Sequence, residues 1–142
     1  MHENDREKLY RSIGKIYCPY FKETVHFTEL GFEHIRFKNR NKSRTIKDQN
    51  MRFKLLPNVV RIINLSHTLQ GKLYKNRFEE RFINNRREIA LTQVIYYEFL
   101  AIIDDKKIKV IIKEITGKEK VFLSVIPFFK QKTPPIEGDG FS

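Results

Sequence analysis

Three residues in the C-terminal third of the chain could do chemistry together: Glu98, Lys113 and Ser124. If the polar segments 104–107 and 116–119 close two symmetric hairpins, Glu98 lies directly opposite Lys113 and Ser124 lies one diagonal step away. A carboxylate beside a cation can serve as general base and phosphate clamp, which cleavage of RNA by its own 2′-hydroxyl requires. The alternative interpretation is a surface salt bridge, which contributes about 0–1 kcal/mol.

His34 is the candidate for proton transfer, because the ordinary pKa of an imidazole lies close to neutral pH. The sequence places it on a short helix that begins after Thr28, which has the side chain of an N-cap. A histidine on a partly apolar helix can equally be a structural residue, and this alternative stays open. Tyr96 and Phe122, expected on the same sheet face as Glu98, could stack on bases or simply pack across strands.

The charge of the chain favours a polyanionic partner. Its 142 residues include 28 Lys and Arg against 17 Asp and Glu, a formal net charge of +11. Much of this excess falls in the segment 36–54, and we expect its first cations to contact phosphates: Arg36, Lys38, Arg40, Lys42 and Arg44. Nucleic acid is the default partner of so basic a small protein, although an acidic membrane, an acidic protein or a merely solvated loop are alternatives.

Cysteine usage and hydropathy favour a cytoplasmic protein. The single cysteine, Cys18, cannot form an intrachain disulfide, and the four scattered histidines have no zinc-site spacing, so we expect neither metal nor cofactor. The first residues lack the apolar core of a signal peptide. The longest apolar stretches, such as 99–103, fall far short of the roughly 18 residues that a membrane span needs.

The order of elements predicts an α+β fold. Residues 1–15 are interpreted as an arm or a short helix, and 15–27 as extended chain broken by Pro19. Residues 55–63 have helical spacing, and Pro57 either starts a helical turn there or kinks a longer helix that begins near Thr45. Segment 69–88 is charged, without a clean period, and predicts a loop or an exposed strand pair. Segments 89–103, 108–115 and 121–129 predict an antiparallel meander. One domain therefore spans 16–130, and 131–142 is expected to be a disordered tail.

Pairing Ile103 with Ile108 and Ile115 with Lys120 fixes the two faces of this meander. The predicted core face is apolar and carries Phe99, Ala101, Val110, Ile112, Val121, Leu123 and Val125. The predicted open face carries Tyr96, Glu98, Leu100, Ile111, Lys113, Phe122 and Ser124.

Four short blocks of the sequence resemble the phage-associated relatives of the barnase, EndoU, colicin and RelE ribonuclease superfamily. They are Cys-Pro at 18–19, Val-His-Phe-Thr-Glu-Leu-Gly-Phe-Glu-His-Ile at 25–35, Arg-Phe-Lys-Leu-Leu-Pro at 52–57 and Phe-Leu-Ser-Val-Ile-Pro at 122–127. In that superfamily a strand leads into a Thr-x-x-Gly-x-x-His-Ile helix, and a meander closes the domain. The resemblance spans roughly residues 16–130.

The resemblance implies RNA cleavage without a metal. It makes His34 the acid–base imidazole and Arg52 a phosphate-binding cation. The alternative for Arg52 is that its stem only covers apolar surface. It also makes Lys113 the strand cation and Ser124 a hydrogen-bonding group near the scissile phosphate. Two departures stand out, since arginine is expected where Lys113 stands and tryptophan is common where Leu123 stands. A lysine offers a point charge in place of a two-pronged guanidinium.

The sequence therefore predicts a metal-independent endoribonuclease of toxin or phage type, in which Glu98 is a second candidate base. The alternative is a non-catalytic nucleic-acid-binding protein of the same fold. A third interpretation is that the positive surface docks an acidic antitoxin or immunity protein.

Overall fold

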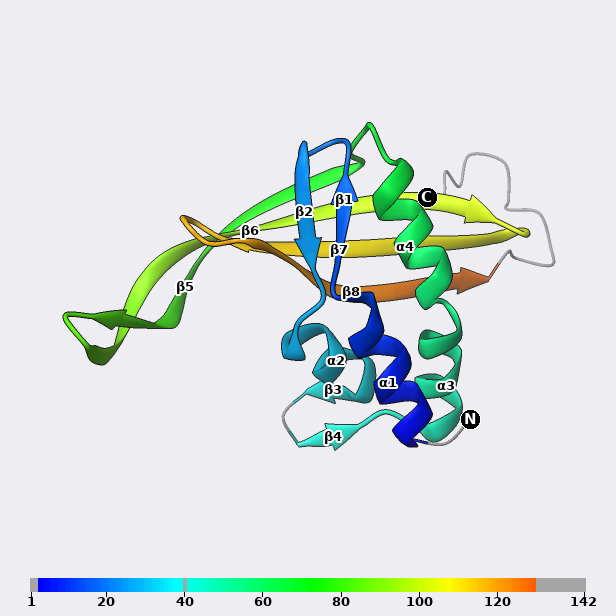
Figure 1. Cartoon of the computed structure of the whole chain (residues 1–142), viewed down its shortest axis with the longest axis horizontal. Helices are drawn as coiled ribbons and strands as arrows, with labels where there is room; N and C mark the ends of the chain where they lie inside the picture. Colours follow the sequence, from blue (N-terminus) through cyan, green and yellow to red (C-terminus); the bar gives the residue numbers. More distant parts are fainter. Residues whose placement is uncertain (1–2, 40, 130–142) are drawn as a thin grey trace, which may run out of the picture.

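The computed structural model of the protein describes residues 3–39 and 41–129 (Figure 1). Arg40 and the predicted tail at 131–142 lie outside the described residues. Four helices lie in the described part of the chain: α1 (Glu3–Ile13), α2 (Glu29–Arg36), α3 (Ile46–Lys54) and α4 (Leu56–Leu65). The strands described are β1 (Lys15–Cys18), β2 (Glu23–His26), β3 (Phe37–Asn39), β4 (Lys42–Ser43), β5 (Gly71–Ile83), β6 (Arg86–Ile103), β7 (Lys106–Ile115) and β8 (Lys120–Phe129).

The larger sheet confirms the α+β prediction and the meander. Its strand order is β1-β2-β8-β7-β6-β5, and every neighbouring pair is antiparallel except β2 with β8. Strands β3 and β4 form a small separate hairpin. The N-terminal segment is a helix, which docks through the buried ring of Tyr10.

The helices form where the sequence supplies starts and apolar faces. Thr45 caps α3, because its hydroxyl accepts a hydrogen bond from the backbone N–H of Asp48 at 3.1 Å. The chain breaks at Leu55, and Pro57 in the first turn starts α4, whose buried face includes Val59 and Ile63. These side chains belong to one core with the sheet residues Phe99, Val110, Ile112 and Val125, as predicted for that face.

Both hairpins of the meander differ from the predicted register. Asp104 and Asp105 alone form the first turn, each with positive φ (51° and 64°), so Ile103 pairs with Lys106 and not with Ile108. In the second hairpin Lys120 pairs with Glu114 and not with Ile115. In the first hairpin the observed pairing is shifted by two residues from the predicted pairing, and a shift of two leaves every side chain on its predicted face.

A bulge in β8 corrects the predicted faces of that strand. Ile111 pairs with Ser124, as predicted, but Ile112 pairs with Phe122, so Leu123 is the extra residue between them. Phe122 therefore points into the core, where its ring stacks on that of Phe27 with a centroid distance of 4.9 Å. Leu123, predicted in the core, faces the opposite side with Lys113. Val121, also predicted in the core, pairs with Lys113 on that side.

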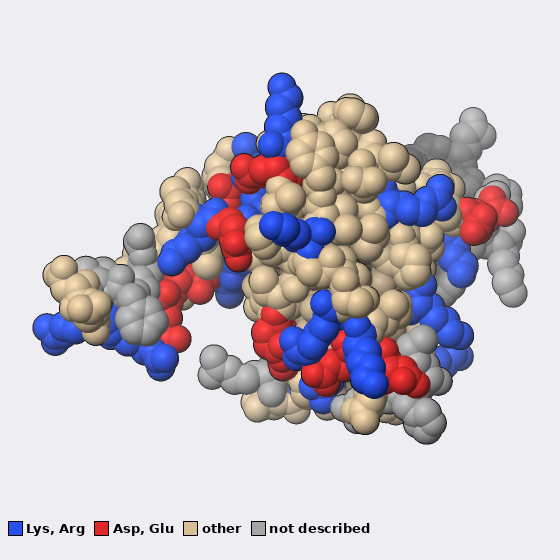
Figure 2. Space-filling view, in the orientation of Figure 1, with Lys and Arg blue, Asp and Glu red and all other residues tan. Residues whose placement is uncertain are grey.

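Strands β5 and β6 continue past the rest of the sheet as a two-stranded ribbon. Pairing between β6 and β7 starts at Val94, so residues 76–93, here called the arm, pair only with each other. Asn84 and Asn85 close its tip with positive φ. Figure 1 shows the arm curving away from the body, and Figure 2 shows a hollow between the arm and the layer of helices. Segment 69–88 thus contains a strand pair, the second of its two predicted forms.

Candidate active site

A cavity of about 470 Å³ lies between α2 and the sheet face that carries Lys113. From the sheet come Tyr96, Glu98, Ile111, Lys113 and Leu123, and α2 contributes Leu30 and His34. The start of β5 and the arm complete the lining with Leu73, Lys75, Arg77, Phe78 and Glu79. Four predicted site residues therefore meet here: His34, Tyr96, Glu98 and Lys113.

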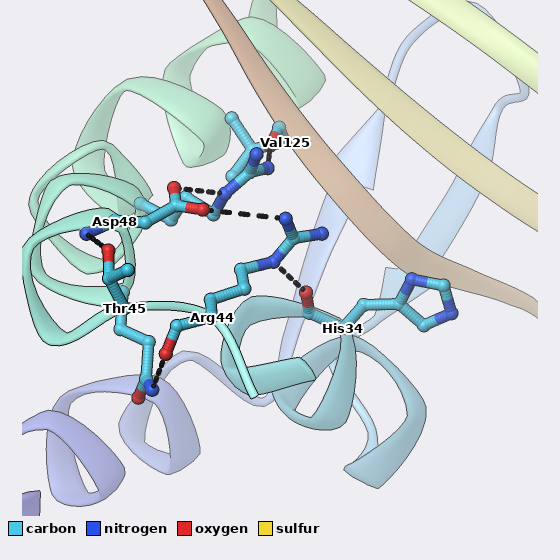
Figure 3. Close-up of polar contacts among 7 residues, drawn as sticks. His34, Arg44, Thr45, Asp48 and Val125 are labelled. Atoms are coloured by element: carbon cyan, nitrogen blue, oxygen red, sulfur yellow. Dashed lines mark hydrogen bonds and ion pairs between the residues drawn. The ribbon is translucent and has the colours of Figure 1, made fainter. Parts of the chain in front are cut away.

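Helix α2 carries His34 into this cavity because its opposite side is fixed in the core. Phe32 and Ile35 are buried, and Gly31 lies so close to Tyr10 and Phe122 that an added methyl group would overlap both. The backbone carbonyl of His34 accepts a hydrogen bond from Nε of Arg44 at 3.0 Å. Figure 3 shows the imidazole pointing away from Arg44.

The surroundings of His34 favour its neutral form. Burial lowers the pKa of the imidazole from its ordinary value of 6.5, and the positive charges of Arg44 and Lys113 lower it further. A neutral imidazole at pH 7 can accept a proton, which is the first task of a general base.

The predicted pair of Glu98 and Lys113 is wrong, although both residues line the cavity. Glu98 pairs in the sheet with Ile111, and its carboxylate lies 3.5 Å from Nζ of Lys109. Tyr96 is the residue opposite Lys113. The Lys113 ammonium lies 3.1 Å from the carboxylate of Glu79, and these two side chains are only 13% and 22% exposed. Its charge is therefore partly offset before any ligand enters.

Arg52 and Ser124 do not line this cavity. Nε of Arg52 donates to Asp48 at 2.8 Å, and its terminal nitrogen donates to the carbonyl of Val125, so the guanidinium ties α3 to β8 (Figure 3). Ser124 is buried opposite Ile111. The structure thus does not bring these two residues to the same place as His34 and Lys113.

The basic segment after α2 divides into exposed and structural cations. Lys38 and Lys42 are exposed, whereas the guanidinium of Arg36 lies over the rings of Phe32 and Phe37. Arg44 is largely buried between the carbonyl of His34 and the carboxylate of Asp48. Only part of the predicted phosphate-contacting set is therefore free to meet a ligand directly.

The proposed stacking role of Phe122 is excluded by its burial in the core. Tyr96, the other predicted stacking residue, does line the cavity.

Comparison with protein families, curated proteins and solved structures gives no match to this chain.

Sequence reasoning missed the contribution of the arm to the site. Arg77, Phe78 and Glu79 line the cavity, but they lie in the charged segment without a clean period. Positive charge beside aromatic residues at 72–78 was the one available signal, and it carries no information about where a ribbon bends.

Two features are absent from the described residues, 3–39 and 41–129. No helix there has the length and apolarity to span a membrane. No three side chains of His, Cys, Asp or Glu gather there as metal ligands would.

Proposed function

We propose that this chain is a metal-independent endoribonuclease of the barnase and RelE-like type. One observation carries the proposal: His34, from a helix, shares a cavity with Lys113, Glu98 and Tyr96 from the sheet. The resemblance of the segment 25–35 to the superfamily's histidine-bearing helix supports the same assignment.

The arrangement suits intramolecular attack by a ribose. The 2′-oxygen attacks the adjacent phosphorus, its proton passes to the neutral imidazole of His34, and the bond from phosphorus to the 5′-oxygen breaks. The 5′-oxygen takes a proton from water, and the protonated imidazole returns its proton to the hydroxide left behind. The products are a 2′,3′-cyclic phosphate and a 5′-hydroxyl. The Lys113 ammonium offsets charge on the phosphate oxygens, and Glu98 is the second candidate base.

The net charge of +11 supports a nucleic-acid substrate, since the release of counterions drives binding to a polyanion. Exposed Lys38 and Lys42 lie on the segment that follows α2, next to the proposed site along the chain. These cations would hold the RNA backbone without reading its sequence.

A non-catalytic nucleic-acid-binding protein is the second candidate, and the ion pairs favour it. Lys113 already pairs with Glu79, and Arg52 pairs with Asp48 outside the cavity lining, so the cavity offers a phosphate less charge than the sequence predicts. Binding through the remaining surface cations would survive this loss, whereas stabilisation of a transition state would weaken.

The test is cleavage of total RNA in EDTA by the wild-type protein and by His34→Ala, with binding measured in parallel. We expect cleavage by the wild type and a loss of about 10²–10⁴-fold in the variant, the usual contribution of a general base. His67→Ala is the matched control, because His67 is exposed and lies outside the cavity lining. Binding without cleavage by the wild type would support the second candidate.

A further inference from the structure

A second cavity, of about 610 Å³, adjoins the first. It is lined by residues of α2, by Phe37, Lys38 and Asn39, and by Arg77 from the arm. Both cavities share Leu30, His34 and Arg77. Because the shared residues come from α2 on one side and β5 on the other, the cavities are two halves of one groove that meet at His34 and Arg77.

Arg77 differs from Lys113 in its partner. One of its terminal nitrogens donates to the hydroxyl of Tyr96 at 2.8 Å, which holds the exposed guanidinium at the groove. In the described part of the chain no carboxylate forms an ion pair with Arg77, whereas Lys113 pairs with Glu79. Its remaining N–H groups can therefore bind a phosphate in the two-pronged geometry that a lysine cannot offer.

Each half of the groove contains an aromatic side chain. Tyr96 lines the first cavity and Phe37 lines the second, and both rings are half-buried. Stacking of a base on such a ring is worth about 1–3 kcal/mol and tolerates any base. Lys38, exposed beside Phe37, adds a positive charge for the neighbouring phosphate.

We infer that Arg77 binds the scissile phosphate across the groove from His34, and that the two cavities hold the nucleotides on either side of it. This inference rests on the proposed function and names its substrate class as single-stranded RNA. Bases that stack on protein rings in separate cavities must be unpaired, so a duplex cannot occupy both halves. Arg77 then supplies the guanidinium that is missing at the position of Lys113.

The test uses a labelled 2′-O-methyl oligonucleotide, which lacks the nucleophilic hydroxyl and cannot be cleaved, as a single strand and as a duplex. Fluorescence anisotropy at several salt concentrations measures its affinity. We expect the wild type to bind the single strand at least about tenfold more tightly, because each stacked base adds to the affinity. Arg77→Ala should weaken this binding about tenfold and reduce the slope of log Kd against log salt by about 0.7, as loss of one phosphate contact does.

Arg86→Ala is the matched control, since Arg86 lies on the same arm, is exposed and lines neither cavity. It should change the affinity less than twofold. In cleavage assays Arg77→Ala should lose about 10²-fold in kcat/KM. Arg77→Lys should recover only part of that loss, because a lysine cannot bind a phosphate in the two-pronged geometry of a guanidinium. Phe37→Leu should weaken single-strand binding and leave duplex binding unchanged.

The outcomes separate the two proposals. If Arg77→Ala matches Arg86→Ala in affinity and in cleavage, or if the duplex binds as tightly as the single strand, the inference is wrong even when His34→Ala abolishes cleavage. If the wild type never cleaves RNA but loses single-strand affinity through Arg77→Ala alone, the groove assignment stands and the proposed enzymatic function fails.

Discussion

Replacing Gly31 by alanine should destabilise the protein, although alanine is the better helix former. A Cβ built on Gly31 would lie 2.4 Å from the hydroxyl oxygen of Tyr10 and 2.7 Å from the backbone carbonyl oxygen of Phe122. The second contact is with backbone, which cannot rotate away. Relief of these overlaps requires α2 to move away from β8.

The magnitude follows from three contributions. Overpacking of a buried site costs about 1–3 kcal/mol. Displacement of Tyr10 weakens its hydrogen bond to the carbonyl of Thr28, worth about 1 kcal/mol. Alanine returns about 1 kcal/mol of helix propensity. The net loss is about 1–3 kcal/mol, which for a chain of this size lowers Tm by roughly 3–10 °C.

Urea and thermal denaturation of Gly31→Ala measure this loss directly. Gly71→Ala is the matched control, because the atoms nearest its new methyl group belong to the flexible side chain of Glu98. We expect that control to stay within about 0.5 kcal/mol of the wild type. A Gly31→Ala protein as stable as the wild type would show that α2 does not approach β8 this closely, and the placement of His34 would lose its basis.

Three further predictions address the imidazole, the arginine tie and the first turn. Because the pKa of His34 is lowered below 6.5 in the folded protein, the unfolded chain binds this proton more readily, so the free energy of unfolding should fall as pH drops from 7 through the folded pKa. Urea titrations of His34→Gln should lack this part of the pH dependence. Arg52→Met should lower the free energy of unfolding, measured by urea denaturation, by about 1–3 kcal/mol, because it leaves the Val125 carbonyl without its donor. Arg11→Met is the control: Arg11 is exposed, and its loss should lower the free energy of unfolding by less than about 1 kcal/mol. Asp105→Gly should raise the free energy of unfolding by about 1 kcal/mol, because Asp105 has φ of 64°, a conformation that glycine adopts without strain. A variant less stable than the wild type would contradict the two-residue turn.

The elements of the meander were predictable, but their register was not. Long runs of Ile, Val, Phe and Tyr between polar segments identify strands, and the segments 104–107 and 116–119 both contain turns. The first turn lacks the glycine that usually indicates a two-residue hairpin. The sequence therefore did not indicate that Asp104 and Asp105 alone form this turn. The bulge at Leu123 has no sequence signal, and a slip of one residue moves Phe122 from the open face to the core.

The candidate site was predictable in part for the same reason. His34 follows a recognisable helix start, and Tyr96, Glu98 and Lys113 kept their face because a two-residue error preserves it. Arg77 could not be found, because most of the arm's described side chains are exposed and no alternation of apolar residues marks its strands. The pairing of Lys113 with Glu79 depends on the bend of that arm, which no local pattern encodes.

The position of β8 between β2 and β7 has a consequence for synthesis of the chain. Residues 15–26 can join the large sheet only through residues 120–121, about a hundred positions later, so this contact has a high entropic cost of closure and a slow rate of formation. A nascent chain on the ribosome that still lacks β8 cannot unite its two sheet fragments. Because α2 packs against β8 at Gly31 and Phe122, we expect the cavity that His34 lines to form only after translation has passed β8.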